Sequence, residues 1–371
     1  MSVMKVLVFP LDMDKVTDFI CYANGLSIDV VGASSVMETC GDFNIKSFHK
    51  LPFITDDSFE AAFVELLTRH AITHVYTPHG AIWTHLACMK LPADESFKFY
   101  LCQPSPYVAD WQRLKPSYKW AKDLLGEYFV ESLGLPHDVK VRSKLKLGQY
   151  ASLHKQFVGI PGQCDDLKLL ALAHIFRILP EGDLVEIGSF QGRSAFAIGW
   201  LARTYKVGNF IGVDPWDIGK VESQGGEADI LNEGLSFERE FVDWDNFFWS
   251  FISAVSILDN VGYIKDISEN AVVEYASACA YGKLVSPEIG EISLTGKIAM
   301  LHIDGNHRYD YVCQDIAAWE PWVKPGGWVL LDDYVWAFGD GPKRAGDELL
   351  LTGKFDVAFT MSDTLFLRKS K

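Results

Sequence analysis

The sequence predicts an α/β protein in which a doubly wound, mainly parallel sheet follows a smaller α/β domain. Residues 184–194, LVEIGSFQGRS, indicate an apolar strand, a turn with two glycines and the start of a helix. A second apolar strand, residues 210–213, follows one strand–helix–strand unit later. Strands that alternate with helical patterns in this way form parallel sheets covered by helices on both faces.

The turn after the first of these strands suits a ligand that carries a nucleoside. Gly188 and Gly192 tolerate positive φ and let a ligand approach the backbone. The pattern is neither GxGxxG nor a GxxxxGK[ST] phosphate loop, and the preceding Glu186 would repel a pyrophosphate but suits a cation. Asp214, at the end of the next strand, is well placed to accept hydrogen bonds from a ribose diol.

This arrangement resembles motifs I and II of the class I S-adenosylmethionine-dependent methyltransferases, which have a Rossmann-like fold. The resemblance implies that Glu186 lies by the cationic methionine end of the cofactor and that Asp214 holds the ribose. Asp266 and Ser268 would edge the adenine. The expected cofactor contacts are Glu186, Gly188, Ser189, Gly192, Ser194, Asp214, Trp216, Asp266 and Ser268. An ordinary strand-to-helix turn of another α/β enzyme is the alternative.

Composition bounds the class of protein and its partners. With 371 residues, 49% of them hydrophobic, the chain can bury two cores. A formal net charge of −15 argues against a nucleic-acid acceptor, because phosphate contacts need clustered lysine and arginine. The seven cysteines lack CxxC spacing and indicate a reduced protein. The first apolar run is too short for a signal sequence or a membrane span, so we expect a soluble, cytoplasmic protein without membrane partners.

The first hundred residues alternate strands and helices and resemble the Rossmann-like pre-ATP-grasp domain that precedes ATP-grasp ligases. The first strand-to-helix turn, residues 9–14, has no glycine to admit a phosphate, and no ATP-grasp catalytic domain follows. A scaffold is therefore favoured over a substrate-recognition or docking domain. The expected organisation is an α/β domain at 1–106, a connecting helical segment at 107–160 and the methyltransferase domain at 161–371.

Three further acids follow two later strands. The strand at 297–303 leads into Asp304, and the strand at 328–331 leads into Asp332 and Asp333. Ligands of open α/β sheets bind outside the carboxyl ends of the strands, so these acids should share one edge with the glycine turn. Three carboxylates suit Mg²⁺ or a similarly hard divalent ion. The alternative is that Asp332 or Asp333 caps a helix or pairs with Lys343 or Arg344.

Residues 303–334 contain Asp-Gly-x-His, a helix, Pro-Gly-Gly and a strand that ends in Asp-Asp, in that order. This stretch resembles the metal-dependent sugar O-methyltransferases of the "methyltransferase 24" group. The resemblance implies that Asp304, Asp332 and Asp333 hold Mg²⁺, which chelates two adjacent sugar hydroxyls. Some relatives have an acidic base where this chain has Asn306. Others use a histidine three residues after the first ligand, so the catalytic base is assigned to His307.

The sequence thus predicts an S-adenosylmethionine- and divalent-metal-dependent O-methyltransferase that acts on a hydroxyl of a sugar, nucleotide sugar or glycosylated small molecule. An oxidative relative of the same fold and a non-catalytic binding module are the alternatives. Residues 215–262 are long for one crossover and are interpreted as a lid or acceptor-binding element. A homo-oligomer is compatible with the sequence.

Overall fold

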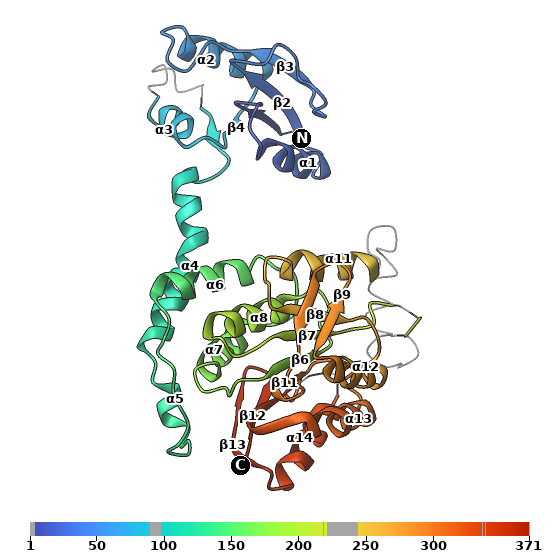
Figure 1. Ribbon diagram of the computed structural model, residues 1–371. Coiled ribbons are helices and arrows are strands. Elements are labelled where there is room, and N and C mark those ends of the chain that lie inside the picture. Colours follow the sequence, from blue (N-terminus) through green and yellow to red (C-terminus); the bar gives the residue numbers. More distant parts are fainter. Residues whose placement is uncertain are drawn as a thin grey trace. The chain divides into compact units, whose positions relative to one another are not determined.

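The computed structural model describes residues 4–89, 98–217, 219–220, 244–335, 337 and 339–370. The chain divides into two compact units, Met1–Pro116 and Ser117–Lys371. The division falls inside helix α4 (Pro106–Gly126), which begins at the residue where the sequence placed the end of the first domain (Figure 1). Among the described helices, none combines the length and the apolar character needed to cross a membrane.

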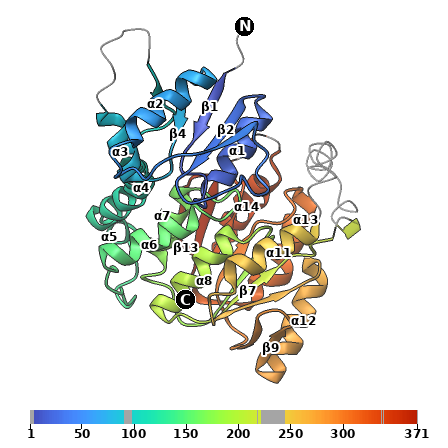
Figure 2. The same cartoon turned by 90° about the horizontal axis from the view of Figure 1, so that it is seen from above.

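The first unit is a parallel five-stranded sheet with the order β3-β2-β1-β4-β5. Helices α2 and α3 pack on one face through Phe59, Phe63 and Leu86, whereas α1 packs on the other through Val16 and Ile20 (Figure 2). The elements are β1 (Lys5–Val8), α1 (Val16–Gly25), β2 (Asp29–Ser34), β3 (Ser47–Lys50), α2 (Phe59–His70), β4 (His74–Tyr76), α3 (Gly80–Cys88) and β5 (Tyr100–Leu101). This agrees with the predicted alternation of strands and helices, in which β3 gives the weakest signal because SFHK lacks an apolar run.

The second unit is built on a seven-stranded sheet with the order β13-β14-β12-β11-β6-β7-β8. Five neighbouring strands are parallel, and β14 runs antiparallel to β12 and β13. The strands are β6 (Asp183–Ile187), β7 (Phe210–Val213), β8 (Val261–Ile264), β11 (Ile298–Ile303), β12 (Val323–Leu331), β13 (Phe355–Met361) and β14 (Thr364–Lys369); β9 (Lys283–Ser286) and β10 (Gly290–Ser293) form a separate hairpin.

Helices cover both faces of this sheet, so the predicted doubly wound fold is confirmed. Helices α7, α8 and α11 share one hydrophobic core with the sheet, and α12, α13 and α14 share the other (Figure 1). Helix α8 lies close to the strands because Gly199 has no side chain; a Cβ there would lie 2.8 Å from Val261 Cγ2. The helices are α5 (Phe129–Ser132), α6 (Leu147–Phe157), α7 (Asp166–Ile175), α8 (Arg193–Tyr205), α11 (Trp244–Val255), α12 (Ser268–Tyr281), α13 (Tyr309–Trp319), the 3₁₀ turn η1 (Glu320–Trp322) and α14 (Gly341–Leu351).

One row of paired residues crosses four parallel strands at their carboxyl ends. Ile187 pairs with Val213 on one side and with Ile303 on the other, and Ile303 pairs with Leu331. The next residue of each strand continues the row: Gly188, Asp214, Asp304 and Asp332. Their amides donate to strand carbonyls, as in Asp304 N to Ile187 O at 2.8 Å and Asp332 N to Ile303 O at 3.0 Å. The strand pairing therefore brings the glycine turn and the predicted acids to one edge.

The buried acid Asp315 provides a test of how α13 packs in the second unit. Burial raises the pKa of Asp315 to about 7. The folded state binds this proton more tightly than the unfolded chain does. The carboxyl therefore lowers the stability of the fold increasingly as the pH rises from the pKa that Asp315 has in the unfolded chain through about 7. Asp315→Asn imitates the protonated acid, so the melting temperature of the variant should exceed that of the wild type at about pH 8. Each unit by which the pKa of Asp315 in the folded state exceeds its value in the unfolded chain costs the wild type about 1.4 kcal/mol of folding free energy at that pH.

Thermal unfolding followed by circular dichroism at about pH 5 and about pH 8 would measure this difference, which should be larger at the higher pH. Asp310→Asn, an exposed residue of the same helix, is the matched control and should show no such pH dependence. Equal effects of Asp315→Asn at both pH values would contradict the account.

Candidate active site

Glu186 lies at the carboxyl end of β6 and is fully buried. One carboxylate oxygen, Oε1, lies 2.9 Å from Nδ1 of His302. His302 is the residue of β11 that pairs with Glu186 in the sheet. The other oxygen, Oε2, is buried and has no hydrogen-bond partner among the described residues. A buried acceptor without a partner is costly. The positive end of a ligand would supply what Glu186 lacks, which fits the predicted place of the sulfonium-bearing methionine group.

The glycine turn, residues 188–192, lies directly against Asp304, the acid that follows β11. Gly188 has a φ of +85°, and a Cβ built on it would lie 1.9 Å from the carbonyl oxygen of Asp304. Gly192 has a φ of +91° and precedes the first residue of α8. Ser189 and Ser194 are both buried beside this turn. Only glycine allows the backbone at 188 to touch the strand end at 304.

Asp214 ties the glycine turn to the end of β7. Its Oδ2 accepts the backbone N–H of Phe190 at 2.9 Å, and its Oδ1 accepts that of Trp216 at 2.8 Å. Burial raises the pKa of Asp214 to about 6, although these two hydrogen bonds act in the opposite direction. Each carboxylate oxygen can accept more than one hydrogen bond, so the carboxylate can hold the turn and still accept ribose hydroxyls.

Three other expected cofactor residues are already engaged by protein groups. The Trp216 ring is buried 4.8 Å from the Phe251 ring, and its Nε1 donates to Phe190 O at 2.7 Å, so it supports the turn from the core. Asp266 Oδ1 pairs with Lys220 Nζ at 2.7 Å. Ser268 Oγ accepts Trp319 Nε1 at 2.9 Å, which turns it toward α13. Local pattern alone did not reveal these partners.

Asp304, His307 and Asp333 bring one ligand atom each to within 4.8 Å of one another. His307 Nε2 lies 3.0 Å from Asp333 Oδ2 and 3.9 Å from Asp304 Oδ1. Strand β12 ends at Leu331, and Asp333 has a φ of +50°, so the chain has left the strand before it reaches this acid. Two carboxylates and an imidazole form a donor set that fits a divalent cation.

Asp332 has partners that the sequence analysis did not predict. Its Oδ2 forms an ion pair with Lys168 Nζ of α7, and its Oδ1 accepts the hydroxyl of Thr364. Lys343 and Arg344, the alternative partners, instead contact Asp347 and the Tyr309 ring. Lys168 gave a weak sequence signal, since it is a single lysine in the otherwise apolar pattern LKLLALAHI.

The charges of this cluster influence one another strongly. Burial and the negative charge of Asp332 raise the pKa of Asp304 well above its usual range. Burial alone would raise the pKa of Asp332, but Lys168 and His302 hold it below its usual range. The edge therefore contains one carboxylate that is fixed in its ionised form beside another that ionises with difficulty. An added cation next to Asp304 would favour its ionised form.

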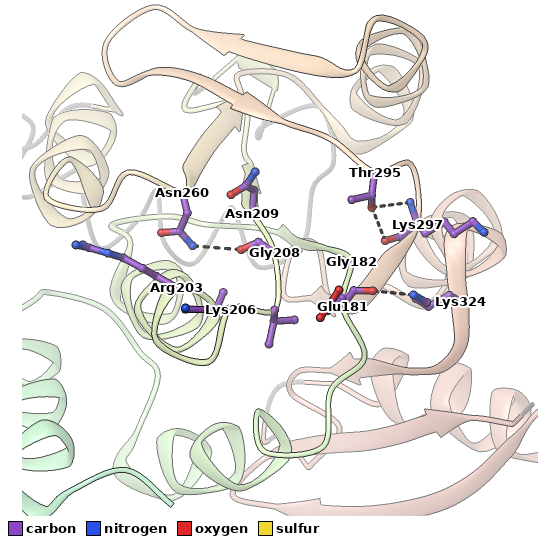
Figure 3. Close-up of a pocket in the computed structure, with 12 residues that line it drawn as sticks. Glu181, Gly182, Arg203, Lys206, Gly208, Asn209, Asn260, Thr295, Lys297 and Lys324 are labelled. Atoms are coloured by element: carbon purple, nitrogen blue, oxygen red, sulfur yellow. Dashed lines mark hydrogen bonds between the residues drawn. The ribbon is translucent and has the colours of Figure 1, made fainter. Parts of the chain in front are cut away.

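A cavity of about 570 Å³ lies at the opposite edge of the same sheet (Figure 3). It is lined by Glu181 and Gly182 before β6, by Asn209 before β7 and by Lys297 before β11. These residues mark the amino ends of the strands, whereas ligands of open parallel sheets bind at the carboxyl ends. No predicted site residue lines this cavity, so it is separate from the candidate active site.

Residues 185–334 match the family described as "Methyltransferase domain". A curated relative, an uncharacterized protein of Acanthamoeba polyphaga mimivirus, is 28% identical over 150 residues, which are 40% of this chain and 50% of that protein. This chain thus spans about half the length of the curated relative that it matches.

Among solved structures, the O-methyltransferase NovP has 21% identity and a TM-score of 0.37, covering 52% of this chain and 73% of NovP. TomG of Streptomyces achromogenes, an O-methyltransferase solved with S-adenosylmethionine, has 15% identity and a TM-score of 0.36, covering 69% and 99% of the two chains.

The family match, together with the doubly wound sheet and the glycine turn, defines the class. The second unit contains a segment that matches a methyltransferase domain, and its doubly wound sheet is the Rossmann-like, class I fold that the sequence predicted. The likeness of the first unit to a pre-ATP-grasp domain stays a prediction. Of the expected lid at 215–262, residues 218 and 221–243 lie outside the described residues.

The role of Asp214 gives a direct test of cofactor binding. Asp214→Asn removes a charged acceptor, and hydrogen bonds to charged groups contribute about 1.5–3 kcal/mol, so the affinity for S-adenosylmethionine should fall by roughly tenfold or more. Because the ionised carboxylate is the stronger acceptor, wild-type affinity should rise with pH through about 6. This rise should be absent in the variant.

Titration calorimetry across this pH range would measure both effects. Asp217→Asn, an exposed acid three residues away, is the matched control and should bind as the wild type does. An affinity of Asp214→Asn that stays within about threefold of the wild type would show that this carboxylate does not hold the ribose.

Proposed function

We propose that this protein is a divalent-metal-dependent O-methyltransferase that acts on a hydroxyl of a sugar, nucleotide sugar or glycosylated small molecule. The observation that carries this proposal is the contact between the glycine turn at Gly188 and the acid cluster at Asp304. A methyl donor on the turn and an acceptor beside the cluster would be neighbours. Holding two reactants at close approach is a large part of catalysis of a bimolecular transfer.

The proposed cofactor contacts are divided along this edge. Glu186, with its unpartnered oxygen, would face the cationic end of S-adenosylmethionine, and Asp214 would accept the ribose hydroxyls. Ser189 and Ser194 would line the turn between them. Trp216 contributes indirectly, because its indole fixes the backbone of Phe190.

Asp304 and Asp333 would hold the divalent ion, and the third acid expected from the sequence, Asp332, lies beside Asp304. The described geometry supports this, since both acids and His307 lie within one small group and Asp304 also belongs to a second group with His302 and Asp332. When bound, S-adenosylmethionine supplies an electrophilic methyl group, and Mg²⁺ supplies a Lewis acid that lowers the pKa of a hydroxyl.

His307 is the proposed general base. Its Nε2 is the atom directed at the acid cluster, at 3.0 Å from Asp333. Nε2–H would donate to the Asp333 carboxylate, which orients the imidazole, and the proton of the acceptor hydroxyl would pass to Nδ1. The acceptor class rests on the order of motifs in residues 303–334, in which the acids and the histidine match a group that methylates sugar hydroxyls.

Substitution of His307 separates a base from a packing residue. His307→Ala should lower kcat by roughly 10²–10⁴-fold, the usual contribution of a positioned general base. The affinity for S-adenosylmethionine should stay near that of the wild type, because the proposed nucleoside contacts lie on β6 and β7. Transfer of a labelled methyl group under single-turnover conditions would measure the chemical step.

A control variant and the rate of His307→Ala decide this assignment. His137→Ala, a histidine outside the acid cluster, is the control and should leave the rate unchanged. If His307→Ala retained most of the wild-type rate, proton removal would belong to another group.

The acids provide a second test of the proposed metal. Asp333→Asn should abolish stimulation by Mg²⁺, because one of the two carboxylates nearest His307 would lose its charge. Binding of S-adenosylmethionine should persist, since the cofactor contacts are separate. Turnover measured against Mg²⁺ concentration, with Asp340→Asn as an exposed control, would check this. Wild-type turnover that survives a chelator would contradict the metal part of the proposal.

A further inference from the structure

A buried lysine, Lys168, lies beside Asp332, one of the acids at the carboxyl ends of β11 and β12. Lys168 is 2% exposed, and its ammonium forms an ion pair with Asp332. A second acid, Asp363 in the turn between β13 and β14, lies 3.6 Å from the same ammonium and is partly exposed. Thr364 donates its hydroxyl to the other oxygen of Asp332. Both oxygens of Asp332 are therefore held by groups of the protein.

This lysine stays charged despite its burial. Its ammonium faces two carboxylates, those of Asp332 and Asp363. A charge in such a position is expensive to bury and persists only where opposite charges offset it. The ammonium thus supplies a fixed positive charge that neutralises part of an edge rich in carboxylates.

We propose that Lys168 is a positioning residue that holds Asp332 away from the metal and limits the affinity of the cluster for divalent cations. The inference rests on the proposed metal-dependent function. It assigns the ion to Asp304 and Asp333, with Asp332 as the partner of the lysine and His307 as the proposed base. With one protein carboxylate fewer as a ligand, a bound ion would keep more positions for acceptor oxygens.

Two variants with opposite expected effects test this inference. Lys168→Met keeps the length of the stem but removes the charge, so Mn²⁺ should bind roughly tenfold or more tightly, since one unit charge nearby changes proton affinity by about 1–3 pKa units. Asp363→Asn leaves Lys168 with one negative neighbour fewer, so Mn²⁺ binding should weaken by about threefold, as expected for a partly exposed pair. A merely structural role would not give changes of opposite sign.

Titration of Mn²⁺ alone into the full chain, followed by the electron paramagnetic resonance of free Mn²⁺, gives the affinities without turnover. Lys119→Met, which removes an exposed lysine paired with Asp123, is the matched control. The double variant Lys168→Met/Asp332→Asn should return affinity toward the wild type, because the released carboxylate is neutralised. If Lys168→Met does not fold, Asp363→Asn still tests the inference. Mn²⁺ binding by Asp363→Asn that is unchanged or tighter than in the wild type would contradict it.

The outcomes distinguish this inference from the proposed function. Mn²⁺ binding by the wild type that Lys168→Met leaves unchanged or weakens would overturn the role of Lys168 and leave the metal site standing. Absence of Mn²⁺ binding from both proteins would overturn the metal site itself. Binding that appears only in Lys168→Met would support the lysine's role and contradict a metal-dependent wild type.

Discussion

The site depends on the register of four parallel strands. Because Val213, Ile187, Ile303 and Leu331 form one row, the next residue of each strand emerges at the same level. A shift by one residue would turn every side chain of a strand to the other face. The absence of a side chain at Gly188 then lets the turn touch Asp304. The proposed cofactor binding and acceptor chemistry would thus both depend on one arrangement of the backbone.

The same arrangement concentrates charges in a place that excludes much of the solvent. Glu186 has one oxygen satisfied by His302 and one without a partner among the described residues. Asp332 is held by Lys168, whereas Asp304 ionises with difficulty. Both proposed ligands carry positive charge, which suits an edge where several carboxylates lie together. Lys168 is the positive charge that the protein itself supplies there.

The fold was predictable because its signals are local. Apolar strands that end in Gly188, Asp214, Asp304 and Asp332 follow one another at the spacing of strand–helix–strand units, and parallel topology places their ends together. Contacts between distant segments were not predictable in this way. Lys168 reaches Asp332 across 164 residues, and His302 faces Glu186 only because β11 pairs with β6. Trp216 looked like a cofactor contact by position, yet an aromatic cluster of α11 surrounds it.

In the proposed function, the edge at Gly188 and Asp304 would bring a methyl donor to a sugar hydroxyl held by a metal ion. The most direct measurement is transfer of a labelled methyl group from S-adenosylmethionine to a panel of nucleotide sugars and glycosylated small molecules, with Mg²⁺ and with a chelator. Labelled sugar O-methyl ethers should form with Mg²⁺, disappear with the chelator and return when Mg²⁺ is restored. Methylation that is indifferent to the chelator, or labelling of non-sugar acceptors alone, would contradict it.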